Sequence, residues 1–310
     1  MKHFCIGIDG GGTKTETVLC GSDGTVYKRV LLAGSNPNDI GVEKAVGILR
    51  ESVRRAADDH KVDAIFAGVS GCTDGDNRAR LSEGLAAAFP DAKLDVQSDI
   101  ANVMLCHAEH LNDKCLAAIC GTGSVVFASD GKGLHRVGGW GYLFDSAGSG
   151  YDIGRDCIAA ILAEEDGIGP KTLLTDLYRE RSGGGAWTTL HTLYKEGKPF
   201  IASFCRTVFE AYDAGDAVAK DILKRNFEHL GLRILQTASL YDCGDTVVLG
   251  GGIKKRRDVL ERFMLPVLKG KITVIFPDLP PVYGAAKGAA ELVGREPEFY
   301  GNFLRTYQEK

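Results

Sequence analysis

The sequence lacks long hydrophobic runs and a leader-like beginning. No stretch reaches the roughly 18 apolar residues that span a bilayer, and no basic segment with an apolar core marks a signal peptide. Low-complexity sequence is absent apart from Ser-Gly-Gly-Gly-Ala at 182–186. We therefore expect a globular, cytoplasmic protein with no membrane partner.

An excess of one charge sign is also lacking. The chain has 37 Lys and Arg against 41 Asp and Glu, a net charge of -4, and the two signs are interspersed. No basic face is available for a nucleic-acid backbone or an anionic membrane. This balance favours small-molecule chemistry and disfavours nucleic-acid partners.

Cys-x-x-Cys pairs are missing although the chain has nine cysteines. Most of them sit in apolar runs, and we expect reduced core thiols. Cys106, Cys115 and Cys120 form the densest trio, but their spacing matches no metal-binding pattern. A metal cluster on this trio is the less favoured alternative.

Strand-like and helix-like segments alternate along the 310 residues, a length that suggests two domains at about 150 residues each. The first three strand-like runs are joined by short glycine turns, so we expect antiparallel hairpins ahead of a helix over residues 41–59. This order predicts an α/β fold and disfavours a plain Rossmann unit.

The opening of the chain is repeated. Residues 4–24 and 115–131 both run apolar strand, Gly-Thr turn, apolar strand and Ser-Asp-Gly. The second copy begins near the expected start of a second domain. We predict domains at 1–113 and 114–288, with the C-terminal helix 289–310 as a candidate addition to the first.

Three glycine-rich turns follow buried-looking strands, at 10–13, 121–124 and 250–252. Glycine lets a backbone approach phosphate closely, and adjacent N–H groups beside a hydroxyl form an anion cradle. Each turn alone could be purely structural, but three together favour phosphate binding. The candidate nucleotide-binding residues are Gly11, Gly12, Thr13, Lys14, Gly121, Thr122, Gly123, Gly250, Gly251 and Gly252.

The first turn is neither a P-loop nor a Rossmann glycine motif. Gly12 is followed by Thr13 rather than Lys, and the next residues are β-branched and alternating, which indicates a strand. Asp9 lies just before the glycines. A carboxylate beside phosphates is favourable when it holds Mg²⁺, which suits phosphoryl transfer; a turn-capping role is the alternative.

The ordered set GIDGGGTKT, CGTGSV, GGWGYLFDSAGSGYDIG and VVLGGGI resembles the sugar kinase, heat-shock and actin-like ATPase superfamily. It is most similar to the N-acetylglucosamine kinase branch, grouped with the BadF/BadG/BcrA/BcrD ATPases. The resemblance covers nearly the whole chain. It implies two ribonuclease-H-like domains with ATP and Mg²⁺ in the cleft between them, an amino sugar beside the γ-phosphate, and a homodimer.

Residues 94–104 read as a strand ending near Ser98 and Asp99, followed by a helix. Asp99 would then lie at the strand's carboxyl end, where open α/β sheets bind ligands. From the residues alone, a helix N-cap is equally possible. The resemblance implies that Asp99 is the general base that accepts the sugar hydroxyl proton.

Further residues are candidates for the sugar pocket. The resemblance implies sugar binding by Asn36, although turn chemistry also explains its Asn-Pro-Asn-Asp context, and Ser70 follows another strand. The glycine-rich run 138–156 predicts a binding loop, with Trp140 as a core residue in the alternative. The candidates in this loop are Gly139, Trp140, Gly141, Asp145 and Ser146.

The loop departs from the family pattern at one point. Relatives have Gly-Asp-Glu-Gly-Ser where this chain has Asp145-Ser146-Ala147-Gly148-Ser149. Ser146 stands where the relatives' sugar-binding Asp stands, so either Asp145 replaces that contact or the pocket takes another sugar. Ser149 to Asp152 has the spacing of a capping box and predicts a helix start.

The sequence therefore predicts an ATP-dependent amino-sugar kinase, most simply converting N-acetylglucosamine to its 6-phosphate. Glucosamine, N-acetylmuramic acid and other amino sugars remain open. An ATPase activator of a 2-hydroxyacyl-CoA dehydratase would need a bridging iron–sulfur cluster. A sugar-sensing repressor would need a helix-turn-helix, which we do not expect because the first strand begins near residue 4.

Overall fold

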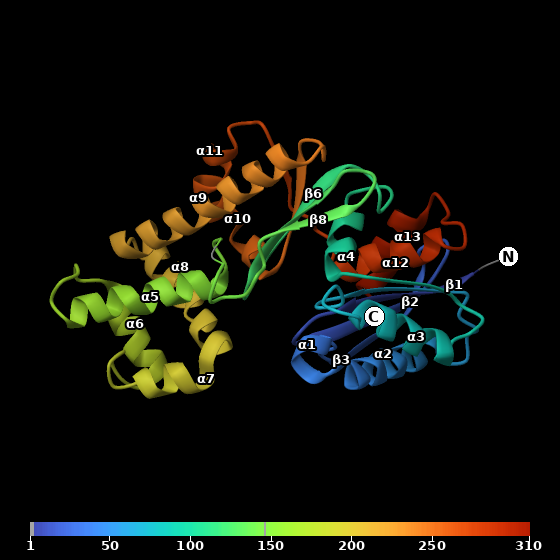
Figure 1. The fold of residues 1–310 in the computed structure, drawn as a ribbon, viewed down its shortest axis with the longest axis horizontal. Helices are drawn as coiled ribbons and strands as arrows, with labels where there is room; N and C mark the ends of the chain where they lie inside the picture. Colours follow the sequence, from blue (N-terminus) through green and yellow to red (C-terminus); the bar gives the residue numbers. More distant parts are fainter. Residues whose placement is uncertain (1–2, 146) are drawn as a thin grey trace. The chain divides into compact units, whose positions relative to one another are not determined.

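The computed structural model describes residues 3–145 and 147–310, and it divides into two compact units (Figure 1). Unit 1 comprises the residues up to Asp113 together with Pro277–Lys310, and unit 2 is Lys114–Phe276. Ser146, one of the predicted sugar-binding residues, lies outside the described residues.

The C-terminal limit of the second domain differs from the sequence prediction. We expected that domain to run to residue 288, but unit 2 ends at Phe276. The reason is that α12 (Pro281–Glu291) packs against β1 (Phe4–Gly10) and α4 (Asp99–Leu105) of unit 1 (Figure 1). A side chain at Gly7 of β1 would clash with the backbone of Ala286, so only glycine lets strand and helix approach this closely.

Unit 1 is a five-stranded mixed sheet with helices on both faces. Its strand order is β3-β2-β1-β4-β5, in which β2 is antiparallel to β1 and β3, whereas β1, β4 and β5 are parallel. The strands are β1 (Phe4–Gly10), β2 (Lys14–Gly21), β3 (Val26–Ala33), β4 (Ala64–Val69) and β5 (Lys93–Gln97). The helices are α1 (Pro37–Ile40), α2 (Val42–Ala57), α3 (Asn77–Ala88), α4 (Asp99–Leu105), α12 and α13 (Phe299–Tyr307).

Apolar side chains that alternate in direction along the strands form a core on each face of this sheet. Ile6 and Ile8 of β1 point to a core completed by α2 and α3, whereas Cys5 points to one completed by α4, α12 and α13. Successive strand residues face opposite sides, so burial of both sets requires helices on both faces. The predicted hairpins before the first long helix are confirmed.

Unit 2 repeats the same sheet. Its order β10-β9-β6-β7-β8 has the same pairing directions as unit 1. The strands are β6 (Cys115–Cys120), β7 (Ser124–Ser129), β8 (Leu134–Val137), β9 (Thr246–Gly250) and β10 (Thr273–Ile275). The helices are α5 (Gly150–Glu165), α6 (Leu173–Ser182), α7 (Leu190–Ser203), α8 (Cys205–Asp213), α9 (Ala217–Leu240), the 3₁₀ helix η1 (Gly252–Arg256), α10 (Arg257–Phe263) and α11 (Leu265–Leu268).

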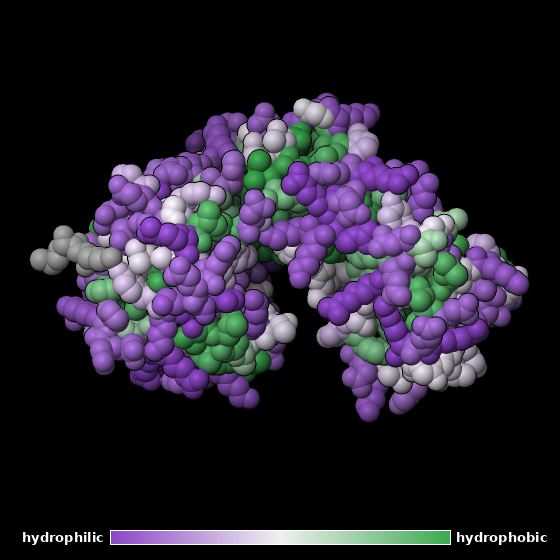
Figure 2. All heavy atoms as spheres, turned by 180° about the vertical axis from the view of Figure 1, so that it is seen from behind, coloured by the Kyte–Doolittle hydropathy of each residue, from purple (hydrophilic) through white to green (hydrophobic). Residues whose placement is uncertain are grey.

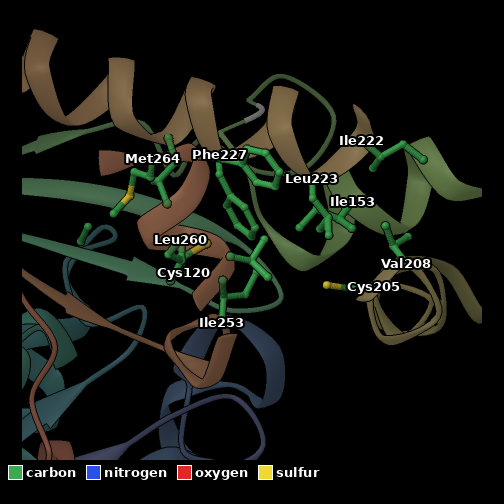
Figure 3. Close-up of a cluster of buried hydrophobic side chains, with 14 of the residues drawn as sticks. Cys120, Ile153, Cys205, Val208, Ile222, Leu223, Phe227, Ile253, Leu260 and Met264 are labelled. Carbon is green, nitrogen blue, oxygen red and sulfur yellow. The ribbon is translucent and has the colours of Figure 1, made fainter. Parts of the chain in front are cut away.

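The repeat seen in the sequence is therefore structural, since β1–β2 and β6–β7 form the equivalent first hairpin of each unit. In unit 2 the core joins the sheet to α5, α8 and α9. Figure 3 shows Ile153, Val208 and Phe227 of these helices in one buried cluster with Cys120 of β6. The long α9 has 24 residues and buries Ile222, Phe227 and Leu230 in this core.

Hydrophilic side chains predominate on the face drawn in Figure 2, with scattered apolar patches. Within the described part of the chain, no helix is both long and apolar enough to cross a membrane. None of the nine cysteines forms a disulfide; Cys106 is partly exposed and the other eight are buried, as predicted for core thiols.

Candidate functional site

The first glycine turn joins β1 to β2 in unit 1. The Gly11 N–H donates to the carbonyl of Lys14 (2.9 Å), and the Gly11 carbonyl accepts from the Ser35 N–H (3.0 Å). A side chain on Gly34 would clash with the Gly12 carbonyl, so the segment after β3 lies directly against the turn. Gly12, Thr13 and Lys14 are exposed. The turn leads into a strand, as predicted.

Asp9 is the second-last residue of β1 and is held by a residue that we did not predict. The side-chain amide of Asn102 donates to Asp9 Oδ1 (2.9 Å) and is 3.3 Å from the Ile8 carbonyl. The pKa of Asp9 is raised to about 6, chiefly by burial and also by the negative charges of Asp99 and Glu16, whereas the hydrogen bond from Asn102 and the charge of Lys14 lower it. The ionised form of Asp9 is thus disfavoured in the folded protein.

Glu16 of β2 is a second buried carboxylate that the sequence did not single out. It pairs with Lys14 Nζ (3.1 Å) and Arg29 Nε (2.7 Å), and it accepts a hydrogen bond from the Tyr307 hydroxyl of α13. Burial opposes ionisation, but these bonds lower the pKa of Glu16. The Lys14 side chain at the turn is therefore positioned by a fully paired carboxylate.

Asp99 begins α4, at the carboxyl end of β5. Its Oδ1 accepts from the Ser98 hydroxyl (3.0 Å), and Ser70, which follows β4, also donates to it. Burial raises the pKa of Asp99 despite these bonds. Because β4 and β5 are parallel, their ends meet at one edge, which brings Ser70 to Asp99.

The N-cap position of α4 belongs to Ser98, so assigning it to Asp99 is wrong by one residue. The Asp99 carboxylate nevertheless accepts from the backbone N–H groups of Asp99 and Ile100 in the first helical turn. A negative charge is favourable at this end of a helix. The same carboxylate is therefore held in place by the helix and by two serine hydroxyls.

Asn36 is the N-cap of α1, and its Oδ1 accepts from the Asn38 N–H (3.0 Å). The turn role left open by the sequence is thus observed. A side chain on Gly71, which has φ +75°, would clash with Asn36 Oδ1, so Asn36 lies beside the Ser70–Gly71 loop. Sugar binding by Asn36 stays a prediction.

The glycine turn between β6 and β7 in unit 2 is fixed by the start of α5. Gly150 N–H donates to the Gly121 carbonyl (2.7 Å), and Tyr151 N–H donates to the Thr122 carbonyl (3.1 Å). The helix start is the predicted capping box of Ser149 and Asp152. The capping box thus fixes the helix against which the turn is held.

The third glycine turn follows β9. Gly251 has φ +92°, and a side chain there would clash with the backbone of Cys120, so this position requires glycine. The neighbouring Gly250 is buried in the strand, whereas Gly252 is exposed and begins η1. Gly251 therefore locks the end of β9 against β6.

A cavity of about 950 Å³ in unit 2 brings two of these turns together. Gly121 and Thr122 line one part, and Gly252 lines another. The wall also includes Arg256, whose guanidinium lies 4.7 Å from the ring centroid of Phe209 and pairs with carboxylates of the same unit. The volume suits a ligand of nucleotide size.

The loop after β8 contains the exposed Trp140. Its side chain is 64% exposed, so the alternative of a core residue is wrong. The guanidinium of Arg136 lies 4.1 Å from its ring centroid. Gly139 and Gly141 both have positive φ, which produces the tight turns on either side of Trp140.

Asp145 holds this loop in place. Its carboxylate pairs with Arg233 of α9 (2.8 Å) and accepts from the N–H groups of Gly139 and Trp140. Although burial opposes it, pairing with Arg233 lowers the pKa of Asp145. Contact between Asp145 and a sugar remains a prediction.

Comparison with known proteins identifies the family. The model of the BadF/BadG/BcrA/BcrD ATPase family matches residues 6–293. The chain belongs to this family. One curated family relative, the N-acetylmuramic acid/N-acetylglucosamine kinase of Clostridium acetobutylicum, is 30% identical over 268 residues, which cover 82% of this chain and 86% of the relative.

Solved structures show the same fold as this family member. A candidate N-acetylglucosamine kinase from Chromobacterium violaceum superposes with a TM-score of 0.72 at 24% identity, covering 92% of this chain and 98% of that one. A ROK family glucokinase from Streptomyces griseus, solved with glucose and AMPPNP, has a TM-score of 0.63 at 20% identity, covering 93% and 98%. The predicted family and its two-domain α/β fold are confirmed.

The residues that sequence reasoning missed are mostly partners of the predicted ones. Asn102 is a polar residue in the otherwise apolar stretch Ile-Ala-Asn-Val-Met, three positions after Asp99, and this was its only signal. Glu16 and Arg233 had none, because Glu16 pairs with Arg29 of the neighbouring strand β3 and Arg233 pairs with Asp145 of a distant loop. Among the described residues, no three or more His, Cys, Asp or Glu side chains are grouped to hold a metal ion.

Proposed function

We propose that this protein is an ATP-dependent amino-sugar kinase that most simply converts N-acetylglucosamine to N-acetylglucosamine 6-phosphate. The observation that carries the proposal is Asp99. It is a partly buried carboxylate with a raised pKa, held by Ser70 and Ser98 at the strand edge that also carries the first glycine turn. A carboxylate so placed suits a general base.

In the proposed reaction, a sugar hydroxyl attacks the γ-phosphorus of ATP. The new bond joins the sugar oxygen to phosphorus, the bond from phosphorus to the β-γ bridging oxygen breaks, and the hydroxyl proton passes to Asp99. The products are the sugar phosphate and ADP. Positioning and charge stabilisation supply most of the rate in such transfers.

The glycine turns are the proposed phosphate sites. In unit 1, exposed Gly12, Thr13 and Lys14 present backbone and ammonium donors beside Asp9. In unit 2, the 950 Å³ cavity between the β6–β7 turn and Gly252 is the proposed nucleotide pocket. The other proposed nucleotide-binding residues are Gly11, Gly121, Gly123, Gly250 and Gly251.

Mg²⁺ fits Asp9. The pKa of this partly buried carboxylate is raised by burial and by the charges of Asp99 and Glu16, so a bound cation would favour its ionised form. A protein usually gives Mg²⁺ one or two carboxylates, and substrate phosphates and water supply the rest. Bound Mg²⁺ would neutralise charge on the phosphate oxygens during transfer. Asn102 would keep Asp9 oriented.

Asn36, Ser70, Gly139, Trp140, Gly141 and Asp145 remain the proposed sugar-binding residues, with Ser146 retained from the sequence. The relatives' names include N-acetylglucosamine, N-acetylmuramic acid and glucosamine kinases, which supports an amino-sugar acceptor without choosing one. We also propose a cytoplasmic homodimer. Nine cysteines without a disulfide suit a reducing compartment, and sedimentation would measure the dimer.

The test is an ADP-coupled assay with ATP, Mg²⁺ and a panel of amino sugars. We expect the wild type to phosphorylate N-acetylglucosamine and Asp99→Asn to lose nearly all of this activity. Asp91→Asn, which changes an exposed carboxylate of unit 1, is the matched control and should keep full activity. No turnover on any amino sugar would refute the kinase, and a fully active Asp99→Asn would refute the base. A brown, cluster-bearing preparation would instead support the dehydratase activator.

A further inference from the structure

Unit 2 contains a second, smaller cavity of about 80 Å³. It is bounded by the β6–β7 turn, the loop 139–145 and Lys198 of α7. A water molecule occupies roughly 30 Å³ in the liquid, and pockets for whole ligands measure about 300–1,000 Å³. The cavity therefore has room for a group of a few heavy atoms, such as a phosphoryl or carboxylate group, but not for a sugar ring.

Lys198 is brought to this cavity by a break in α7. Gly197 has φ +63°, outside the helical range, and Pro199 follows, so the chain turns at Lys198. A Cβ added to Gly123 would lie 3.7 Å from Lys198 Nζ, which places the ammonium against the turn. The ammonium also lies 5.8 Å from the ring centroid of Tyr142.

The positive charge of Lys198 has no carboxylate partner in the described part of the chain within ion-pair distance. It pairs with none of the acids that neutralise the other half-buried cations of unit 2, such as Arg233 and Arg256. A half-buried ammonium loses part of its hydration, and pairing with an anion offsets the free energy lost. Lys198 is therefore poised for an anion from outside the chain.

Two backbone N–H groups of the β6–β7 turn also lack a hydrogen-bond acceptor among the described residues. Gly121 N–H is bonded to the Gly123 carbonyl (2.9 Å), whereas the N–H groups of Thr122 and Gly123 make no hydrogen bond to the described residues. Adjacent free N–H groups in a glycine turn form an anion-binding nest. Asp145 also lines the cavity, but its charge is offset by Arg233 and two N–H groups.

We propose that Lys198 and the Thr122–Gly123 backbone form an oxyanion-binding site for a substrate phosphate or carboxylate. The inference rests on the proposed kinase function and adds a binding residue to it. A nucleotide phosphate is one source, because Thr122 lines both this cavity and the 950 Å³ cavity. The carboxylate of an acidic amino sugar is the other, because the cavity also touches the loop proposed to bind sugar.

The experiment compares wild type, Lys198→Met and Lys198→Arg, with Lys195→Met as control because Lys195 is exposed on the same helix. Calorimetry measures binding of a non-hydrolysable ATP analogue and of AMP. A lost charge-assisted bond weakens binding roughly tenfold or more. We expect that loss in Lys198→Met for the analogue but not for AMP, partial recovery in Lys198→Arg, and no change in the control.

The second arm measures KM for N-acetylmuramic acid and for neutral N-acetylglucosamine. A rise in Lys198→Met confined to the acidic sugar would support the site and identify the anion as a carboxylate. A third arm uses tripolyphosphate and thermal unfolding, which reports on the pocket even in a chain that phosphorylates no sugar. If Lys198→Met folds and matches wild type in all three arms, the site is refuted while wild-type turnover still supports the kinase.

Discussion

Asp9→Asn is expected to abolish activity and to stabilise the protein. The folded protein holds the pKa of Asp9 at about 6 against an ordinary 3.8, so ionised Asp9 opposes folding. A difference of about 2 pKa units corresponds to about 3 kcal/mol at pH well above 6. Asparagine is nearly isosteric and can still accept from Asn102, but it carries no charge. We therefore expect a gain in unfolding free energy of up to about 3 kcal/mol at pH 7.5.

The sign of the pH dependence follows from the raised pKa. Between pH 3.8 and 6 the folded protein binds more protons than the unfolded chain, so the wild type regains stability as the pH falls through that window. The advantage of Asp9→Asn should shrink to about 1 kcal/mol at pH 4.5. Calorimetric unfolding in EDTA measures both values, with exposed Asp59→Asn as the control.

A variant that is no more stable than wild type at pH 7.5 would refute the reasoning, as would an equal gain at both pH values. Adding Mg²⁺ and an ATP analogue gives an independent readout. Ligand that binds only the folded state raises its stability. Adding Mg²⁺ and the ATP analogue should therefore raise the unfolding free energy of the wild type more than that of Asp9→Asn. An equal rise in both proteins would argue against Asp9 as a metal ligand.

Three further outcomes are expected. Asp99→Asn should lower kcat by about 10²- to 10⁴-fold in the coupled assay with little change in KM for ATP. Gly251→Ala should lower the unfolding temperature of unit 2, because its side chain would meet Cys120, whereas Gly252→Ala, with open space around it, should not. Arg233→Met removes the ion pair with Asp145 that holds loop 139–145, and it should raise KM for the sugar. An unchanged KM would show that this loop does not take part in sugar binding.

The sequence predicted most of the fold because its signals were local. Glycine turns between β-branched runs predicted the two hairpins, and the Ser-Asp-Gly repeat predicted the second sheet. The domain limit at 288 failed for a non-local reason. The small residues of α12 do not say which sheet this helix covers, whereas in the structure it packs against β1 and α4 of unit 1, with Ala286 close to Gly7.

The site shows the same division. Asp9, Asp99 and the glycines could be singled out from the sequence because each lies at or just after the end of a strand and carries its own chemistry. Their supports were not, since Asn102 reaches Asp9 across 93 positions and Arg233 reaches Asp145 across 88. A sequence pattern shows which residue ends a strand, but not which distant side chain the fold brings to it.

Three carboxylates of unit 1, Glu16, Asp9 and Asp99, differ in how the fold neutralises their charge. This difference distinguishes a structural carboxylate from the two that we propose to be functional. Glu16 is surrounded by Lys14, Arg29 and Tyr307 and has a lowered pKa. Asp9 and Asp99 are partly buried, and burial raises the pKa of both despite the hydrogen bonds that they accept. Glu16 shows that this sheet can pair a buried acid with cations. Among the described residues neither Asp9 nor Asp99 forms such an ion pair, which fits the roles that we propose for them. One charge would meet a metal ion and the other would receive a proton.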